Sequence, residues 1–576
     1  MGHPKVNRIS YTLRKYPAAR FVTLLLFLAA GIFLLLVSTR SILRKPFISE
    51  IAPSVGAPGD ILILRGENFG RTRGSSYVEL CGNRLTESGY VSWDDDLIKV
   101  IVPGNTEDGL VYVATRAGKS NPEFFANELA IPVEMPENPM SVIPVITELS
   151  LQEAAPGQIL SISGRNFGAS RGESNVYFTA HREGQGAENV PDMAGVETER
   201  PKYSGFETPN EADFDYEYWS ESEIRVRVPD GAASGSVFVA TNEGRSTLQP
   251  FVVKSRVGEK VWAGRHTYLV QVGADFHNIK GSDAATVTIH VPRPIVFAWQ
   301  PEAVMTESVP EPALLDYRGN SIFQITPADK TSAKNYSSAR QNYVVTSCGV
   351  ECLVNKDYAA PFKEKNRMLY KAYTRADDII PSASKEVLDL LPKIIFQVKN
   401  PYRQAELVFD YFVENFKIAP KTRDAGADVL DLIKRKRGDA YDFAVVYAAL
   451  LRAAGVPCRA LSGILIDADK QTRNHWWNEF YIEGFGWIPV DTALGAGMDF
   501  KAFQSERNSG KYYFGNIDAQ RVAFSLSYKV IKQSLLSNKT VRMPRSFAMQ
   551  SIWEEAGPDV ESYSSYWIVP AVLGIY

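Results

Sequence analysis

The sequence predicts a multidomain protein: an N-terminal transmembrane helix, two all-β sandwiches, a further β-region and an α+β domain. Three observations carry this prediction. Residues 21–39 form an uncharged apolar run, a long motif occurs twice between residues 46 and 253, and helical spacing of apolar residues begins near residue 380. A chain of 576 residues is too long for one hydrophobic core, so several domains are expected.

The overall composition is that of ordinary globular domains. Hydrophobic residues make up 45% of the chain and charged residues 22%. The net charge of −3 gives no reason to expect a nucleic-acid partner. The sequence contains no phosphate-binding loop, dinucleotide fingerprint or metal-ligand cluster, so we predict no cofactor and no metal.

The apolar run at residues 21–39 is predicted to be a transmembrane helix. Nineteen residues at about 1.5 Å each cover the hydrocarbon core of a bilayer, which is roughly 30 Å thick. The alternative is a cleaved signal peptide, whose apolar region would be shorter and would end at a small-residue cleavage site. This run ends in VSTR, which favours an uncleaved single-pass anchor.

The charges that flank this helix predict its orientation. More basic residues precede it than follow it: Lys5, Arg8, Arg14, Lys15 and Arg20, against Arg40, Arg44 and Lys45. This bias places residues 1–20 in the cytoplasm as a tail. The bulk of the chain is then extracytoplasmic, and periplasmic if the cell is Gram-negative.

Two stretches of the chain repeat one another. Residues 66–74 read GENFGRTRG and residues 164–172 read GRNFGASRG, and WDDDLIKVIVP and WSESEIRVRVP follow at Trp93 and Trp219. Alternating strands separated by Gly, Pro and Asn predict β-sandwiches. The glycine motifs lie 98 residues apart and the tryptophans 126, so the second copy carries about 28 extra residues.

These motifs resemble the IPT/TIG family of immunoglobulin-like domains. The resemblance covers residues 46–127 and 144–253, and it implies spacers or modules that bind ligands or proteins. In the insertion of the second copy, Asp213, Asp215 and Glu217 alternate. A calcium site is conceivable there, but the EF-hand spacing is absent, so we predict a solvated acidic loop.

Residues 255–345 are predicted to form another β-domain, because period-2 alternation recurs within them. His266, His277 and His290 lie there without carboxylate or cysteine partners at ligand spacing, which favours surface positions. Cys348 and Cys352 could form a local disulfide only if the chain turned between them. The sequence leaves that pairing open.

The α+β domain begins with helical patterns and continues with strands. Asp439 is predicted to cap a helix that runs to Ala454, where Gly455 follows. A second helix is predicted over residues 427–437. Strands are predicted at residues 458–464 and 475–481, and a third begins at residue 486.

This part of the chain resembles the transglutaminase-like superfamily, which has a papain-like fold. The residues that carry the resemblance are GDAYDFA from Gly438, GVPCRA from Gly455, HWWNE from His475 and GWIPVD from Gly486. We assign residues 346–525 to this domain and residues 526–576 to a C-terminal extension.

The resemblance implies a Cys–His–Asp triad, of which His475 would be the base and Asp491 its orienting acid. The nucleophile position holds Ala440, and a methyl group cannot attack a carbonyl. The neighbouring Cys458 is expected to pack beneath the helix, where it could not replace the missing thiol.

Three functional hypotheses follow. We favour a membrane-anchored, catalytically inactive transglutaminase-like protein that binds a peptide, protein or cell-wall ligand. Its possible ligand cleft is formed by Asp439, Tyr441 and Trp477, where the helix start would offer free N–H groups. One alternative is a thiol-independent amidase or peptidase-type hydrolase that uses His475 and Asp491. The other is an adhesion or assembly scaffold that acts through the IPT/TIG domains.

Overall fold

The structure of the chain is a computed structural model. It describes residues 44–127 except 105, 107 and 108, then 142–180, 203, 205–282, 284–327, 336–504, 510–543 and 545–576, and isolated helical residues between 18 and 32. The predicted tail and about half of the predicted helix at 21–39 lie outside this set. Within it, no helix is long and apolar enough to cross a membrane.

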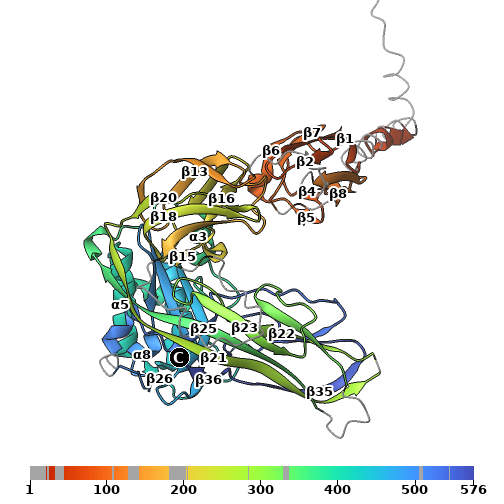
Figure 1. The fold of residues 1–576 in the computed structure, drawn as a ribbon. Helices are drawn as coiled ribbons and strands as arrows, with labels where there is room; N and C mark the ends of the chain where they lie inside the picture. Colours follow the sequence, from red (N-terminus) through yellow and green to blue (C-terminus); the bar gives the residue numbers. More distant parts are fainter. Residues whose placement is uncertain are drawn as a thin grey trace, which may run out of the picture. The chain divides into compact units, whose positions relative to one another are not determined.

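The described residues form two compact units. The first comprises residues 1–142 and 168–172, and the second comprises residues 143–167 and 173–576. The first contains a β-sandwich (Figure 1). One sheet is ordered β1 (Phe47–Ala52), β3 (Ile61–Glu67), β7 (Leu97–Ile101), β6 (Tyr90–Trp93). The other is ordered β2 (Val55–Gly56), β10 (Glu123–Asn127), β8 (Gly109–Thr115), β4 (Tyr77–Leu80), β5 (Asn83–Arg84), with β9 (Gly118–Lys119) on β8.

The second sandwich, in the second unit, repeats this topology. Its first sheet is ordered β11 (Val145–Leu149), β13 (Ile159–Arg165), β17 (Glu223–Arg227), β16 (Tyr216–Trp219). Its second is ordered β12 (Glu153–Ala154), β20 (Gln249–Val253), β18 (Ala232–Thr241), β14 (Asn175–Ala180), β15 (Phe206–Glu207), with β19 (Gly244–Arg245) on β18. The internal repeat of the sequence is therefore a repeat of structure.

The repeated glycine motif is required by close packing. A Cβ atom added at Gly66 would lie 2.0 Å from the carbonyl oxygen of Phe47, and one at Gly164 would lie 2.1 Å from that of Val145. The repeated tryptophan closes the same turn, because the indole of Trp219 donates to the carbonyl of Phe167 at 3.0 Å. Side chains larger than hydrogen cannot occupy the glycine positions.

The predicted β-domain at 255–345 and the predicted C-terminal extension share their sheets, so they are not separate modules. The long strands β21 (Gly258–Gly281) and β25 (Tyr336–Val354) pair side by side (Figure 1). The strands that complete their sheet are β23 (Glu302–Val309), β31 (Asn516–Ile517), β35 (Val560–Trp567) and β36 (Ala571–Ile575). A second sheet is ordered β24 (Asn320–Ile325), β22 (Val287–Pro292), β34 (Glu554–Ala556), β33 (Lys539–Val541).

Two expectations for this region are resolved by the strands. Cys348 and Cys352 lie on the unbroken strand β25, and they form no disulfide in the described chain. The prediction that His290 lies at the surface is wrong. Its side chain is buried, and its Nε2 lies 2.8 Å from Oε1 of Glu555, 265 residues further along the chain.

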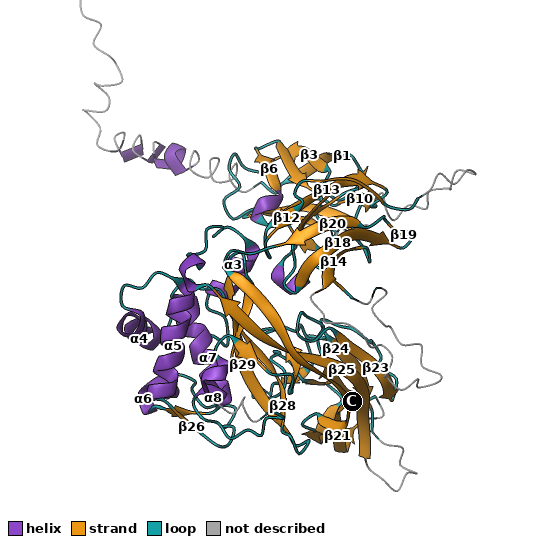
Figure 2. Cartoon of the chain, turned by 60° about the vertical axis from the view of Figure 1, so that its left-hand side comes forward, coloured by secondary structure: helices purple, strands orange, loops and turns teal. Residues whose placement is uncertain are grey.

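The last part of the second unit packs helices against a sheet ordered β30 (Gly486–Val490), β29 (Thr472–Ile482), β28 (Cys458–Ile466), β32 (Arg521–Ser525). The helices gather on one side of the unit (Figure 2). They are α3 (Met368–Thr374), α4 (Lys385–Ile395), α5 (Pro401–Asn415), α6 (Asp431–Arg435), α7 (Ala440–Ala453) and α8 (Thr492–Gly495). The helix predicted at 427–437 is thus shorter, whereas α7 has the predicted cap and is buried along nearly its whole length.

Candidate functional site

The start of α7 is held by a reciprocal capping box. Oδ1 of Asp439 accepts from the backbone N–H of Asp442 at 2.9 Å, and Oδ2 of Asp442 accepts from that of Asp439 at 3.0 Å. Ala440 is the first helical residue and is 7% exposed. The position that the sequence assigns to the nucleophile therefore presents a nearly buried methyl group at a helix start whose cap is already satisfied.

His475 and Asp491 form a hydrogen-bonded pair inside the protein. Nε2 of His475 lies 2.6 Å from Oδ2 of Asp491, and neither residue has any exposed surface. His475 is on β29, and Asp491 follows β30 as the N-cap of α8, where its Oδ1 accepts from the N–H of Leu494 at 3.0 Å. Burial alone would raise the pKa of Asp491, but His475 and Arg521 hold it well below its usual range.

The other imidazole nitrogen of His475, Nδ1, is the atom that general acid–base catalysis would use. Nε2 of His475 is hydrogen-bonded to Asp491. Nδ1 is therefore the ring nitrogen that is available to exchange a proton with a reactant. Nδ1 is buried and makes no hydrogen bond to any residue that the structure describes. A general base needs a proton donor within hydrogen-bond reach, and an imidazole with no exposed surface has no direct contact with bulk water.

Arg521 is a third member of this cluster that sequence reasoning missed. Its Nη2 donates to Oδ2 of Asp491 at 2.9 Å and its Nη1 to Oδ1 of Asp518 at 2.7 Å. The guanidinium is buried and lies between two carboxylates. The sequence motifs end at Asp491, and Arg521 lies 30 residues further along the chain, so no motif pointed to it.

Two further arginines cover the start of α7. Arg545, from the C-terminal region, donates to Asp439 at 2.7 Å and to Asp442 at 3.0 Å. Arg423 donates to Oδ2 of Asp442 at 2.8 Å. The guanidinium of Arg545 also lies 4.8 Å from the ring centroid of Tyr441. These contacts explain why both capping carboxylates are buried.

The predicted ligand cleft is therefore closed in this structure. Asp439 is 2% exposed, Tyr441 5% and Trp477 2%. The capping box uses the backbone N–H groups of Asp439 and Asp442, so these two groups are not free to bind a ligand. Cys458 packs in the interior as expected, and burial raises the pKa of its thiol far above its usual value.

The acidic loop of the second sandwich is not solvated, which corrects the prediction for Asp213 and Asp215. Asp213 accepts from Nη1 of Arg459 at 2.7 Å, and Arg459 also donates through Nε to Glu479 at 2.8 Å. Asp215 pairs with Arg367 at 3.3 Å. Burial raises the pKa of both aspartates, and the arginines oppose that shift. The insertion thus joins the second sandwich to the α+β domain.

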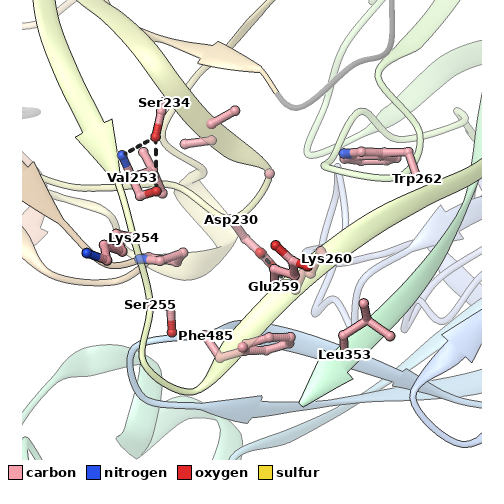
Figure 3. A pocket seen from close by; sticks show the side chains of 15 residues that line it. Asp230, Ser234, Val253, Lys254, Ser255, Glu259, Lys260, Trp262, Leu353 and Phe485 are labelled. Carbon is pink, nitrogen blue, oxygen red and sulfur yellow. Dashed lines mark hydrogen bonds and ion pairs between the residues drawn. The ribbon is translucent and has the colours of Figure 1, made fainter. Parts of the chain in front are cut away.

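A cavity of about 600 Å³ lies beside this junction (Figure 3). Asp230, from the second sandwich, forms an ion pair with Lys260 of β21 and accepts from the N–H of Trp487 at 2.9 Å. The ammonium of Lys260 lies 5.1 Å from the ring centroid of Phe485. Trp262, Leu353 and Phe485 supply apolar surface, while Ser234, Lys254, Ser255 and Glu259 supply polar groups.

Comparison with known protein families agrees with the domains found here. Residues 389–492 match the model of the transglutaminase-like superfamily, and residues 46–126 match that of the IPT/TIG domain. The chain therefore contains a transglutaminase-like domain and an IPT/TIG domain. His475, Asp491 and Ala440 all lie within the first of these matches.

Individual relatives resemble only parts of the chain. An uncharacterised protein of Haemophilus influenzae is 31% identical over 162 residues, covering 23% of this chain and 44% of that protein. The periplasmic domain of TgpA from Pseudomonas aeruginosa is 16% identical with a TM-score of 0.21, covering 39% of this chain and 87% of that one. A structure described as a cysteine protease of Cytophaga hutchinsonii is 12% identical with a TM-score of 0.35, covering 55% and 91%.

Replacing Arg459 tests whether the junction depends on its buried charge. Arg459→Met leaves Asp213 and Glu479 buried without their shared cation, so we expect it to lower the free energy of unfolding by roughly 3–5 kcal/mol. The measurement is urea unfolding of the full chain, followed by tryptophan fluorescence.

Lys385→Met is the matched control. It removes one partner of an exposed i,i+4 ion pair with Asp389 and should leave the unfolding midpoint unchanged. An equal and small effect of both substitutions would show that the buried network does not stabilise the junction.

Proposed function

We propose that the chain is a cell-envelope protein whose transglutaminase-like domain binds a ligand without catalysing acyl transfer. The observation that carries this proposal is Ala440 at the nucleophile position, beside a His475–Asp491 pair that is otherwise complete. Without a thiol no covalent acyl intermediate can form, because an alanine side chain has no lone pair to attack a carbonyl.

The surroundings of the pair support a structural role for it. His475 and Asp491 have no exposed surface, and Asp491 is held by donors from β29, α8 and β32. Enzymes of this chemical type need the base to reach both nucleophile and substrate. The same burial speaks against the thiol-independent hydrolase, which would require water at His475.

The envelope location rests on the N-terminal apolar run. We propose that residues 21–39 anchor the chain as a single-pass helix with the body outside the cytoplasm. The described residues of this run are helical, and their large apolar side chains are exposed, including Phe21 at 68% and Leu26 at 65%. A helix that exposes apolar side chains suits a lipid environment.

The cavity beside Asp230 and Lys260 is our candidate for the ligand site, because the predicted cleft at α7 is closed. It lies where the second sandwich, β21 and the β29–β30 turn meet, and ligand sites favour such junctions. Apolar Trp262 and Phe485 beside hydroxyl and charged groups suit a ligand that is partly apolar and rich in hydrogen-bonding groups. A short peptide or glycan fragment of the cell wall fits that description.

The absence of catalysis is tested by restoring the thiol. Purified full chain should show no amide hydrolysis or amine transfer above background, and His475→Ala should change stability without changing turnover. In a Cys81→Ser background, the thiol of Ala440→Cys should alkylate far more slowly than a free cysteine, because position 440 is 7% exposed at a closed helix start. Turnover by the wild type that disappears in His475→Ala would refute the proposal.

Ligand binding is tested with fragments of peptidoglycan. We expect the full chain to bind a component of a muramidase digest, and Trp262→Ala to weaken that binding at least about tenfold because it removes an apolar wall of the cavity. Isothermal titration with separated peptide and glycan fractions gives the affinity and the ligand class.

Tyr358→Ala is the control for this experiment. Tyr358 is an aromatic side chain, 56% exposed, that does not line the cavity, so binding should be unchanged. Equal binding by wild type and Trp262→Ala would show that the ligand does not bind in this cavity.

A further inference from the structure

A basic and apolar loop near the C-terminus has no part in the site described above. Residues 528–543 contain Lys529, Lys532, Lys539 and Arg542 but no aspartate or glutamate, although the chain as a whole carries a net charge of −3. Two adjacent leucines, Leu535 and Leu536, stand at the centre of this segment.

The two leucines are presented to solvent. Leu535 is 60% exposed and Leu536 is 96% exposed, which makes Leu536 nearly as accessible as in an extended chain. Single exposed apolar residues are common on protein surfaces, but adjacent exposed leucines in a turn form a contiguous apolar surface, which is the kind of feature that marks a contact with a partner or a membrane.

Buried polar groups hold this loop in place. Oε2 of Glu555, a fully buried residue, accepts from the N–H of Ser534 at 2.8 Å, from its hydroxyl at 2.7 Å and from the amide of Asn538 at 3.0 Å. Its Oε1 lies 2.8 Å from Nε2 of His290. The turn between Ser534 and Asn538 is closed by the N–H of Asn538 donating to the carbonyl of Leu535. These hydrogen bonds therefore fix the loop in a conformation that exposes both leucines.

Basic side chains flank the apolar tip. Lys532 precedes it, Lys539 and Arg542 follow it, and all three are exposed. Lys539 begins β33 (Lys539–Val541), which pairs with β34, and Arg542 directly follows that strand. An apolar tip within a set of cations matches the surface of an anionic bilayer, whose acyl boundary accepts the leucines and whose phosphates attract the cations.

We infer that residues 532–542 dock the second unit on an anionic lipid surface, with Leu535 and Leu536 inserted at the boundary between headgroups and acyl chains. The bilayer is the favoured partner because the chain carries an apolar run at 21–39, which would keep its body close to a membrane. Each basic residue near such a surface raises the binding affinity about fivefold. Three exposed cations therefore give weak, reversible binding, which becomes effective when the chain is tethered to the same membrane.

The test places a reporter at the loop tip, because the N-terminal run could itself enter a bilayer. Full-length Leu536→Cys, in a Cys81→Ser background, is labelled with an environment-sensitive fluorophore. It is then mixed with vesicles of phosphatidylcholine alone, or of phosphatidylcholine and phosphatidylglycerol in equal parts. We expect a blue shift, and quenching by spin-labelled lipid, on the anionic vesicles only.

Two controls make the result specific. A label on Phe396→Cys, at an apolar position that is 80% exposed outside the loop, should not respond. Adding Lys532→Glu and Lys539→Glu to the labelled Leu536→Cys chain should raise the lipid concentration needed for half of the shift at least about tenfold. Absence of a shift on anionic vesicles, an equal shift on neutral vesicles, or a shift without lipid that grows with protein concentration would each overturn the inference. The last of these outcomes would indicate contact between copies of the chain.

Discussion

The buried guanidinium of Arg459 is the interaction on which the second unit depends. It bridges Asp213 of the second sandwich and Glu479 of β29, while its plane lies 3.9 Å from the ring centroid of Trp487. A charge in the interior is tolerated when it is paired and hydrogen-bonded, so these contacts favour the arrangement in which the two domains pack together. This requirement gives the acidic end of the insertion a structural role, because that end supplies Asp213 and Asp215.

The same principle explains the ion pairs around Asp491 and at the start of α7. Asp491 is satisfied by His475, Arg521 and a backbone N–H, and the two carboxylates at the start of α7 are satisfied by Arg423 and Arg545. Removing one partner from either set would leave another charge buried and unpaired, so each arrangement stabilises the interior.

Local patterns in the sequence were sufficient for the elements whose determinants are close in the chain. The cap at Asp439, the strands around His475 and the two glycine motifs depend on neighbouring residues, and each was predictable. The burial of Asp213 was not, because its partner Arg459 is 246 positions away, and Arg367 is 152 positions from Asp215. The burial of His290 could not be predicted for the same reason, because its partner Glu555 lies on a strand 265 residues further along the chain.

The central claim is that the start of α7 is a closed structural element, and hydrogen exchange tests it most directly. In the full chain, the amides of Asp439 and Asp442 each donate to the other's carboxylate, beneath Arg545. The account predicts that they exchange as slowly as interior α7 amides such as that of Val446, through global unfolding of the second unit. Exchange of the first-turn amides at the rate of exposed loops, while Val446 stays protected, would reveal an open site and contradict the account.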